Sequence, residues 1–131
     1  MQDLFQLGDQ KTYMKAVTSA DFAQFEAGLV HPVCSTFALG QAMEWASRLF
    51  VLEMKDADEE GIGTMLHIDH QGPAFAGETL QVVATYKNLT GNALLCDISV
   101  HAGERLVATG QTGQKILKKE KLHRLLTNKP Q

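Results

Sequence analysis

Residues 36–55 constrain the fold more than any other part of the chain, because they predict a helix whose surface is apolar almost all round. Its apolar side chains recur at spacings of three or four and form two adjacent rows: Ala38, Ala42, Trp45, Leu49 and Leu52, and Leu39, Met43, Ala46 and Phe50. We expect such a helix to be covered on most of its sides. Pro32 keeps the preceding chain extended, and Ser35 or Thr36 has the side chain of a helix N-cap.

After Gly61 the apolar period changes to two, which is typical of strands. Three alternating runs are separated by short turn sequences and predict an antiparallel meander: 78–88, 93–101 and 106–116. Two further segments are strand-like and bring the expected number of strands to five: 11–18 and 63–70. We interpret 21–32 as a short helical turn followed by a loop, and 118–130 as a charged end that is helical or frayed.

One long helix and a meander predict an α+β fold in which an antiparallel sheet wraps around the helix. The length of 131 residues fits one domain, 1–131. An open sheet of five strands has unpaired edges, and pairing with a second copy would protect them. We therefore expect a homodimer, with a tetramer as the larger alternative.

Charge and cysteine content exclude several classes of protein. The net charge of −3 is unlike that of a broad nucleic-acid-binding face, and it offers no attraction to an anionic membrane. Cys34 and Cys96 are too few for a disulfide framework, and no spacing typical of a metal site is present. Because the chain shows neither a signal sequence nor a long apolar run, we expect a reduced, cytoplasmic protein without a metal.

Glu44 and His70 are the first candidates for chemistry. Glu44 lies in the apolar sequence AMEWA, where burial of a carboxylate is costly unless it is paired. The alternative is an exposed carboxylate paired with Arg48 one helical turn further on. His70 ends a predicted strand, a common place for functional side chains, although a surface histidine is the alternative. Alternation places His67 and Asp69 on the opposite face from His70, which argues against a metal site there.

Thr36 and Cys34 lie at the start of the predicted helix. Thr36 is the expected cap, and its hydroxyl could also contact a substrate oxygen near the free N–H groups. On one helix Thr36 and Glu44 would be separated by about 12 Å, too far for a direct hydrogen bond. Cys34 is a candidate nucleophile, but no neighbouring residue supplies a base, so packing is the favoured role.

These residues together resemble the hotdog-fold acyl-CoA thioesterases, and most closely the fluoroacetyl-CoA thioesterase group. The resemblance rests on a shared register from position 36 to about 110: Thr36, Met43-Glu44-Trp45, Gly63-Thr64, His70 and Gly77. It implies a helix wrapped by an antiparallel sheet and active sites at the interface of a dimer. The fluoroacetyl-specific enzyme carries an arginine where this sequence has Gln114, so we expect a general small or medium acyl-CoA as substrate.

The resemblance also implies roles for individual residues. Thr36, Glu44 and His70 would be the catalytic set, with Glu44 as nucleophile or general base, His70 assisting proton transfer and Thr36 orienting Glu44 or the carbonyl. Substrate contacts would come from Gly63, Thr64, Gly77 and Gln114. We expect Thr36 and Glu44 to act from different helix faces, across the dimer. Phe37 and Met43 would line a tunnel for the acyl group.

The implied reaction is hydrolysis of an acyl-CoA thioester to a carboxylate and free CoA, with no cofactor beyond the CoA of the substrate. Two alternatives remain open. One is a hotdog hydratase or dehydratase, although its Asp-x-Asn-Pro-type stretch is missing. The other is a dimer that binds acyl-CoA or a small ligand without catalysis. A buried, unpaired Glu44 and an aligned His70 would favour the enzyme, whereas an exposed Glu44 in a salt bridge with Arg48 would favour the binding protein.

Overall fold

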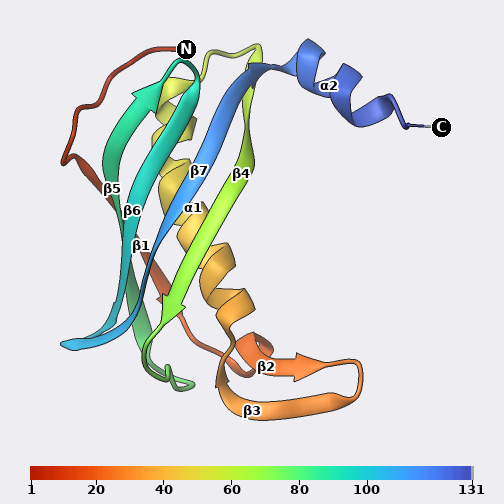
Figure 1. Ribbon diagram of the computed structural model, residues 1–131. Coiled ribbons are helices and arrows are strands. Elements are labelled where there is room, and N and C mark those ends of the chain that lie inside the picture. The colour runs from red at the N-terminus through yellow and green to blue at the C-terminus, as the bar shows by residue number, and fades with distance from the viewer. Residues whose placement is uncertain (131) are drawn as a thin grey trace.

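The computed structural model describes residues 1–130 and shows one long helix lying across a curved sheet (Figure 1). The elements in chain order are β1 (Gln10–Ala16), η1 (Ser19–Asp21), β2 (Phe22–Phe25), β3 (Gly28–Cys34), α1 (Thr36–Met54), β4 (Glu59–His70), β5 (Thr79–Thr90), β6 (Ala93–Ala102), β7 (Arg105–Lys118) and α2 (Lys119–Thr127). The β2–β3 hairpin extends from the start of α1, and α2 projects from the opposite end of the sheet (Figure 1). Within residues 1–130, no helix is long and apolar enough to cross a membrane.

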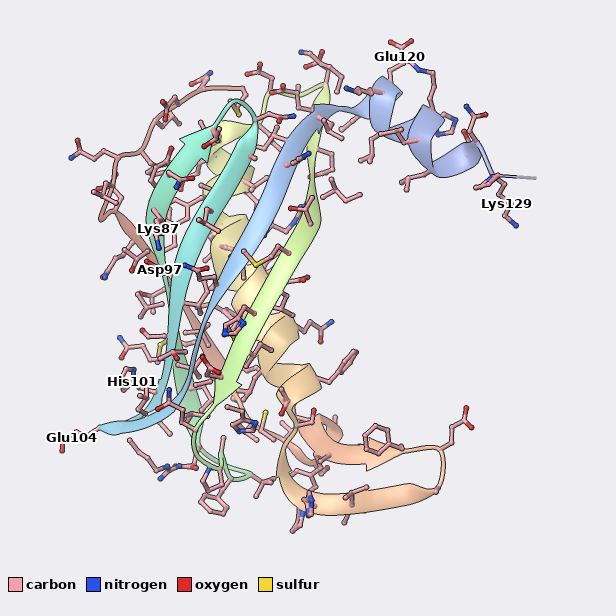
Figure 2. All side chains as sticks on the ribbon, in the orientation of Figure 1. Lys87, Asp97, His101, Glu104, Glu120 and Lys129 are labelled. Atoms are coloured by element: carbon pink, nitrogen blue, oxygen red, sulfur yellow. The ribbon has the colours of Figure 1, made fainter. Side chains whose placement is uncertain are left out.

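The main sheet contains five antiparallel strands in the order β1-β5-β6-β7-β4. Burial alternates along β6, with the even-numbered residues buried. The outward face carries polar side chains, including Lys87, Asp97 and His101 (Figure 2). The predicted α+β class, the five strands and the meander are therefore confirmed, and β4 lies at one edge of the sheet.

The helix α1 is held by large side chains that face the sheet. Five of them are 0% exposed: Leu39, Met43, Phe50, Val51 and Met54. Each contributes about 1.5–3 kcal/mol by leaving water. The opposite side of α1 is less covered than we expected, because Phe37, Trp45 and Leu52 are 84%, 42% and 42% exposed.

The cap of α1 corrects one expectation. Ser35, not Thr36, is the N-cap, and its Oγ accepts a hydrogen bond from the Ala38 N–H at 3.0 Å. Thr36 is the first helical residue. The two neighbours have equally suitable side chains, so composition alone could not separate them. The Thr36 hydroxyl is consequently free for another partner.

Residues 21–32 also differ from our expectation, because they form most of a β-hairpin rather than a helical turn and loop. Only the 3₁₀ turn η1 is helical, and it ends at Asp21. β2 and β3 then pair antiparallel in a separate two-stranded sheet. Gly28 adopts a φ of +114°, which favours glycine and lets the chain reverse. Aromatic and β-branched residues flank this turn and suit paired strands.

A β-bulge at Thr64 changes which side chains of β4 face the helix. Gly63 pairs with Gln114 and Met65 with Gly113, so Thr64 is an extra residue. Before the bulge, odd-numbered positions such as Gly63 face α1, whereas Leu66 and Ile68 face it afterwards. Because of the bulge, residues from both halves of β4 pack against α1.

Candidate active site

Thr36 and His70 are brought together at the N-terminal end of α1. The Thr36 Oγ1 lies 2.9 Å from Nδ1 of His70, within hydrogen-bond distance. Thr36 comes from the first turn of α1 and His70 from the last residue of β4. Both side chains are exposed in the single chain. The hydrogen bond engages Nδ1 of the imidazole and leaves Nε2 facing away from Thr36.

Glu44 shares a groove with Thr36, which corrects our expectation that they act from different helix faces. Positions 36, 40 and 44 form one row along α1. A pocket of about 370 Å³ lies between this row and β4, lined by Thr36, Phe37, Gly40, Gln41, Glu44, Leu66 and Ile68. The Glu44 carboxylate and the Thr36 hydroxyl, which contacts His70, thus line one largely apolar groove within the same chain.

The Glu44 carboxylate lies directly over Gly63. A Cβ added to Gly63 would lie 3.6 Å from Glu44 Oε1, an ordinary contact distance, so the carboxylate lies close above this part of β4. Glu44 also borders a second pocket of about 220 Å³, lined by Gln41, Glu44, Trp45, Arg48, Gly63 and Gln114. The carboxylate therefore separates an apolar pocket from a more polar one.

The Glu44–Arg48 pair that would favour a binding protein does not form. Arg48 instead donates to Glu60 Oε1 at 2.8 Å. The N–H of Gly61 and, after it, this Arg48 contact hold the pKa of the Glu60 carboxyl below its usual value. In the part of the chain that the structure describes, the half-buried Glu44 carboxylate has neither a salt bridge nor a side-chain hydrogen bond. It is available to a substrate or a water molecule.

The four residues expected to contact substrate occupy different places. Gly63 and Gln114 line the polar pocket beside Glu44. Thr64 is the exposed extra residue of the bulge. Gly77 lies in the turn between β4 and β5, with a φ of +89°, and its N–H donates to the Val17 carbonyl at 3.0 Å.

Met43 and the cysteines lie outside the pockets around Glu44. Met43 is fully buried in the core, so only Phe37 of the two expected tunnel residues lines a groove. Burial raises the pKa of the Cys34 thiol to about 11 and that of Cys96 to about 12. Neither is a thiolate at neutral pH, which supports packing as the role of Cys34. Residues 1–130 contain no group of three His, Cys, Asp or Glu side chains placed for a metal ion.

Gln41 is a pocket residue that the sequence did not single out. It lines both pockets around Glu44 and also a larger one of about 740 Å³ beneath the β2–β3 hairpin. A polar residue three positions before Glu44 in an apolar helix is the signal that could have identified it. The larger pocket also includes Thr36 and Phe37, so it adjoins the groove.

Two comparisons with known proteins find relatives, and one finds none. A family model described as fluoroacetyl-CoA-specific thioesterase matches residues 17–120, a range that contains Thr36, Glu44 and His70. No curated protein matches the sequence.

Solved structures show the same fold. A hypothetical protein of Thermus thermophilus, described as a thioesterase superfamily member, is 30% identical over 95% of this chain and 93% of its own, with a TM-score of 0.91. The fluoroacetyl-CoA thioesterase is 21% identical over 98% of this chain and 100% of its own, with a TM-score of 0.88. A hot-dog-like protein from Thermanaerovibrio acidaminovorans is 18% identical over 95% and 92%, with a TM-score of 0.86. The expected hotdog fold is confirmed.

Proposed function

Because the chain belongs to the fluoroacetyl-CoA-specific thioesterase family, we propose that it hydrolyses an acyl-CoA thioester to a carboxylate and free CoA. The family supports a thioester hydrolase in general. The acyl-CoA substrate and the roles of individual residues are our proposal. The acyl group is left open, because fluoroacetyl-CoA is named for relatives only 21% identical.

One observation carries this proposal: an unpaired carboxylate and the hydroxyl that contacts the His70 imidazole line the same groove. Glu44 lines the groove from the middle of α1, and Thr36, whose hydroxyl contacts Nδ1 of His70, lines it from the first turn. Apolar side chains of Phe37, Leu66 and Ile68 lie between them. A thioester carbonyl held in this groove would meet a base and a proton donor, with an apolar wall for its acyl chain.

In the proposed reaction, Glu44 accepts a proton from water while the water oxygen attacks the thioester carbonyl carbon. With the Thr36 hydroxyl donating to Nδ1 of His70, Nε2 carries the imidazole proton and donates to the carbonyl oxygen. Collapse of the tetrahedral intermediate breaks the C–S bond, and the CoA sulfur takes up the proton that Glu44 accepted. Alternatively, a Glu44 carboxylate oxygen attacks the carbonyl carbon, the C–S bond breaks, and the CoA thiolate leaves and takes up a proton from solvent. Water then hydrolyses the acyl–Glu44 anhydride to the carboxylic acid and free Glu44.

The first test is release of free CoA from acyl-CoAs of increasing chain length and from aromatic acyl-CoAs. We expect the wild-type protein to hydrolyse at least one of them. Glu44→Gln and His70→Ala should each lower kcat/KM by about 10²- to 10⁴-fold, the usual contribution of a general acid or base. Isotope labelling distinguishes the two routes. In a single turnover in ¹⁸O-labelled water, label can enter the Glu44 carboxylate only by the anhydride route.

Two matched variants control for nonspecific damage. His67→Ala removes an exposed histidine of the same strand that contacts Asp69 rather than Thr36. Glu53→Gln removes an exposed carboxylate of the same helix, paired with Lys11. Both should keep wild-type activity. If the folded protein released no CoA from any acyl-CoA, the thioesterase proposal would be refuted. The alternative of a protein that binds acyl-CoA or a small ligand without catalysis would then be favoured.

A further inference from the structure

We propose that Gln114 is a positioning residue for Glu44, a role that rests on the proposed function of Glu44. From β7 its Nε2 donates to the main-chain carbonyl of Glu44 at 3.1 Å and to the Ser47 Oγ at 2.9 Å. The Ser47 hydroxyl donates in turn to the same Glu44 carbonyl at 3.0 Å. The three bonds form a closed triangle around one turn of α1.

Burial sets this triangle apart from ordinary surface polar contacts. Gln114 is 5% exposed and Ser47 is 1% exposed, in a core that is otherwise almost entirely apolar. An amide and a hydroxyl are costly to bury unless their partners are fixed. Both side chains direct their hydrogen bonds at the residue that carries the candidate catalytic carboxylate.

The register between β4 and β7 places a second residue, Gly63, against Glu44. Gln114 pairs directly with Gly63, the residue beneath the Glu44 carboxylate. One member of this cross-strand pair holds the main chain of Glu44, and the other lies against its side chain. The position of the carboxylate along the groove therefore depends on β7 as well as on α1. The Gln114 amide donates within the protein, so its role differs from the substrate contact expected from the sequence.

The test compares isosteric variants by steady-state kinetics on an acyl-CoA that the wild-type protein hydrolyses. Gln114→Met keeps the volume and loses the donor. We expect kcat to fall about 10- to 100-fold, the effect of a small misplacement of a reacting group, with KM within about twofold. Ser47→Ala retains the direct Gln114 bond and should lower kcat less. The double variant should be no worse than Gln114→Met, because both act through one carbonyl.

Thr112→Val is the matched control. Thr112 lies two residues away on the same strand, is 1% exposed, and has the only buried side-chain oxygen or nitrogen in residues 1–130 that lacks a hydrogen-bond partner. Its removal should leave kcat unchanged. Unchanged kcat in both Gln114→Met and Ser47→Ala would overturn the proposal. A higher KM at unchanged kcat in Gln114→Met would also overturn it, and would make Gln114 a substrate-binding residue.

A spectroscopic readout keeps this test independent of turnover. In protein labelled with ¹³C at glutamate carboxyls, the Glu44 resonance is identified by its loss in Glu44→Gln. We expect the chemical shift of this resonance to move towards those of the exposed glutamates in Gln114→Met and to stay unchanged in Thr112→Val. An unmoved resonance would refute positioning. If the wild-type protein hydrolyses no acyl-CoA but the resonance moves in Gln114→Met, the proposed function is refuted, whereas the positioning of Glu44 by Gln114 is supported.

Discussion

Gly61 and Gly63 are two residues apart on β4 and both face α1, but they leave different amounts of room. A Cβ on Gly61 would lie 2.7 Å from Val51 Cγ1, closer than real contacts allow. A Cβ on Gly63 would lie 3.6 Å from Glu44 Oε1, at ordinary contact distance. A side chain at position 61 would therefore crowd the core, whereas a methyl group at position 63 would fit but would occupy the space beside the Glu44 carboxylate.

This difference predicts opposite outcomes for two alanine substitutions. Gly61→Ala should destabilise the fold by about 1–3 kcal/mol, because the crowded core must shift. Gly63→Ala should change stability by less than about 0.5 kcal/mol but lower kcat/KM, since the methyl group takes the space beside the carboxylate. Urea denaturation and CoA release measured on both variants check this. Equal losses of stability would show that both glycines serve packing alone.

The β2–β3 hairpin is tied to the rest of the chain through η1. The Asp21 carboxylate accepts from the Thr18 N–H at 3.0 Å and pairs with Lys15 of β1 at 3.1 Å. The Asp21 carbonyl accepts from the N–H of Ser35, the cap of α1, at 2.8 Å. One residue thus links β1, the hairpin and the start of the helix that carries Thr36.

This link predicts a loss of stability in acid. Burial raises the pKa of Asp21, but the Thr18 N–H and Lys15 outweigh it, so the folded pKa lies below the ordinary value of 3.8 for an aspartate. A lowered carboxyl pKa stabilises the fold above about pH 3.8, and the contribution disappears as the pH falls through the folded value. Asp21→Asn should therefore cost about 1–2 kcal/mol at pH 7 and less at pH 3. Denaturation curves of both proteins at each pH decide this, and a difference independent of pH would contradict it.

Periodicity in the sequence predicted α1 and the meander, because each has one buried face with a distinct repeat. The hairpin was missed because Phe22, Ala23 and Phe25 fit a short helix as well as a strand, and only the turn at Gly28 separates the two. Site candidates emerged from a shared register rather than from any single motif. That Glu44 stands unpaired, and that Gln114 holds it, depends on contacts between distant segments that no local pattern contains.

An edge strand and uncovered apolar side chains together favour self-association. Among residues 1–130, β4 pairs only with β7, so the other edge of this twelve-residue strand has no partner strand there. Phe37, Trp45 and Leu52 of α1 and Met65 and Leu66 of β4 are exposed in the single chain. A second copy pairing along β4 would satisfy the edge and cover apolar surface near the groove. The homodimer therefore remains a prediction, and β4 is its predicted interface.

Sedimentation equilibrium tests the dimer. We expect twice the chain mass of 14.4 kDa and a Tm that rises with protein concentration. Antiparallel pairing centred on β4 places Met65 near its own copy, so Met65→Lys should weaken the dimer by like-charge repulsion. Gln81→Lys adds the same charge to an exposed position on β5 and should leave the dimer intact. A monomer at every concentration would contradict the prediction.

The bulge at Thr64 makes the spacing within β4 as important as its side chains. Gly63 and His70 are seven positions apart, an odd separation that would place them on opposite faces of a regular strand. They nevertheless face the same side of the sheet, because the unpaired residue of the bulge between them shifts the alternation by one position. Losing a single codon between them would turn His70 away from Thr36 without altering any reactive group. Natural variation in this stretch should accordingly tolerate exchanges of residue more readily than changes of length.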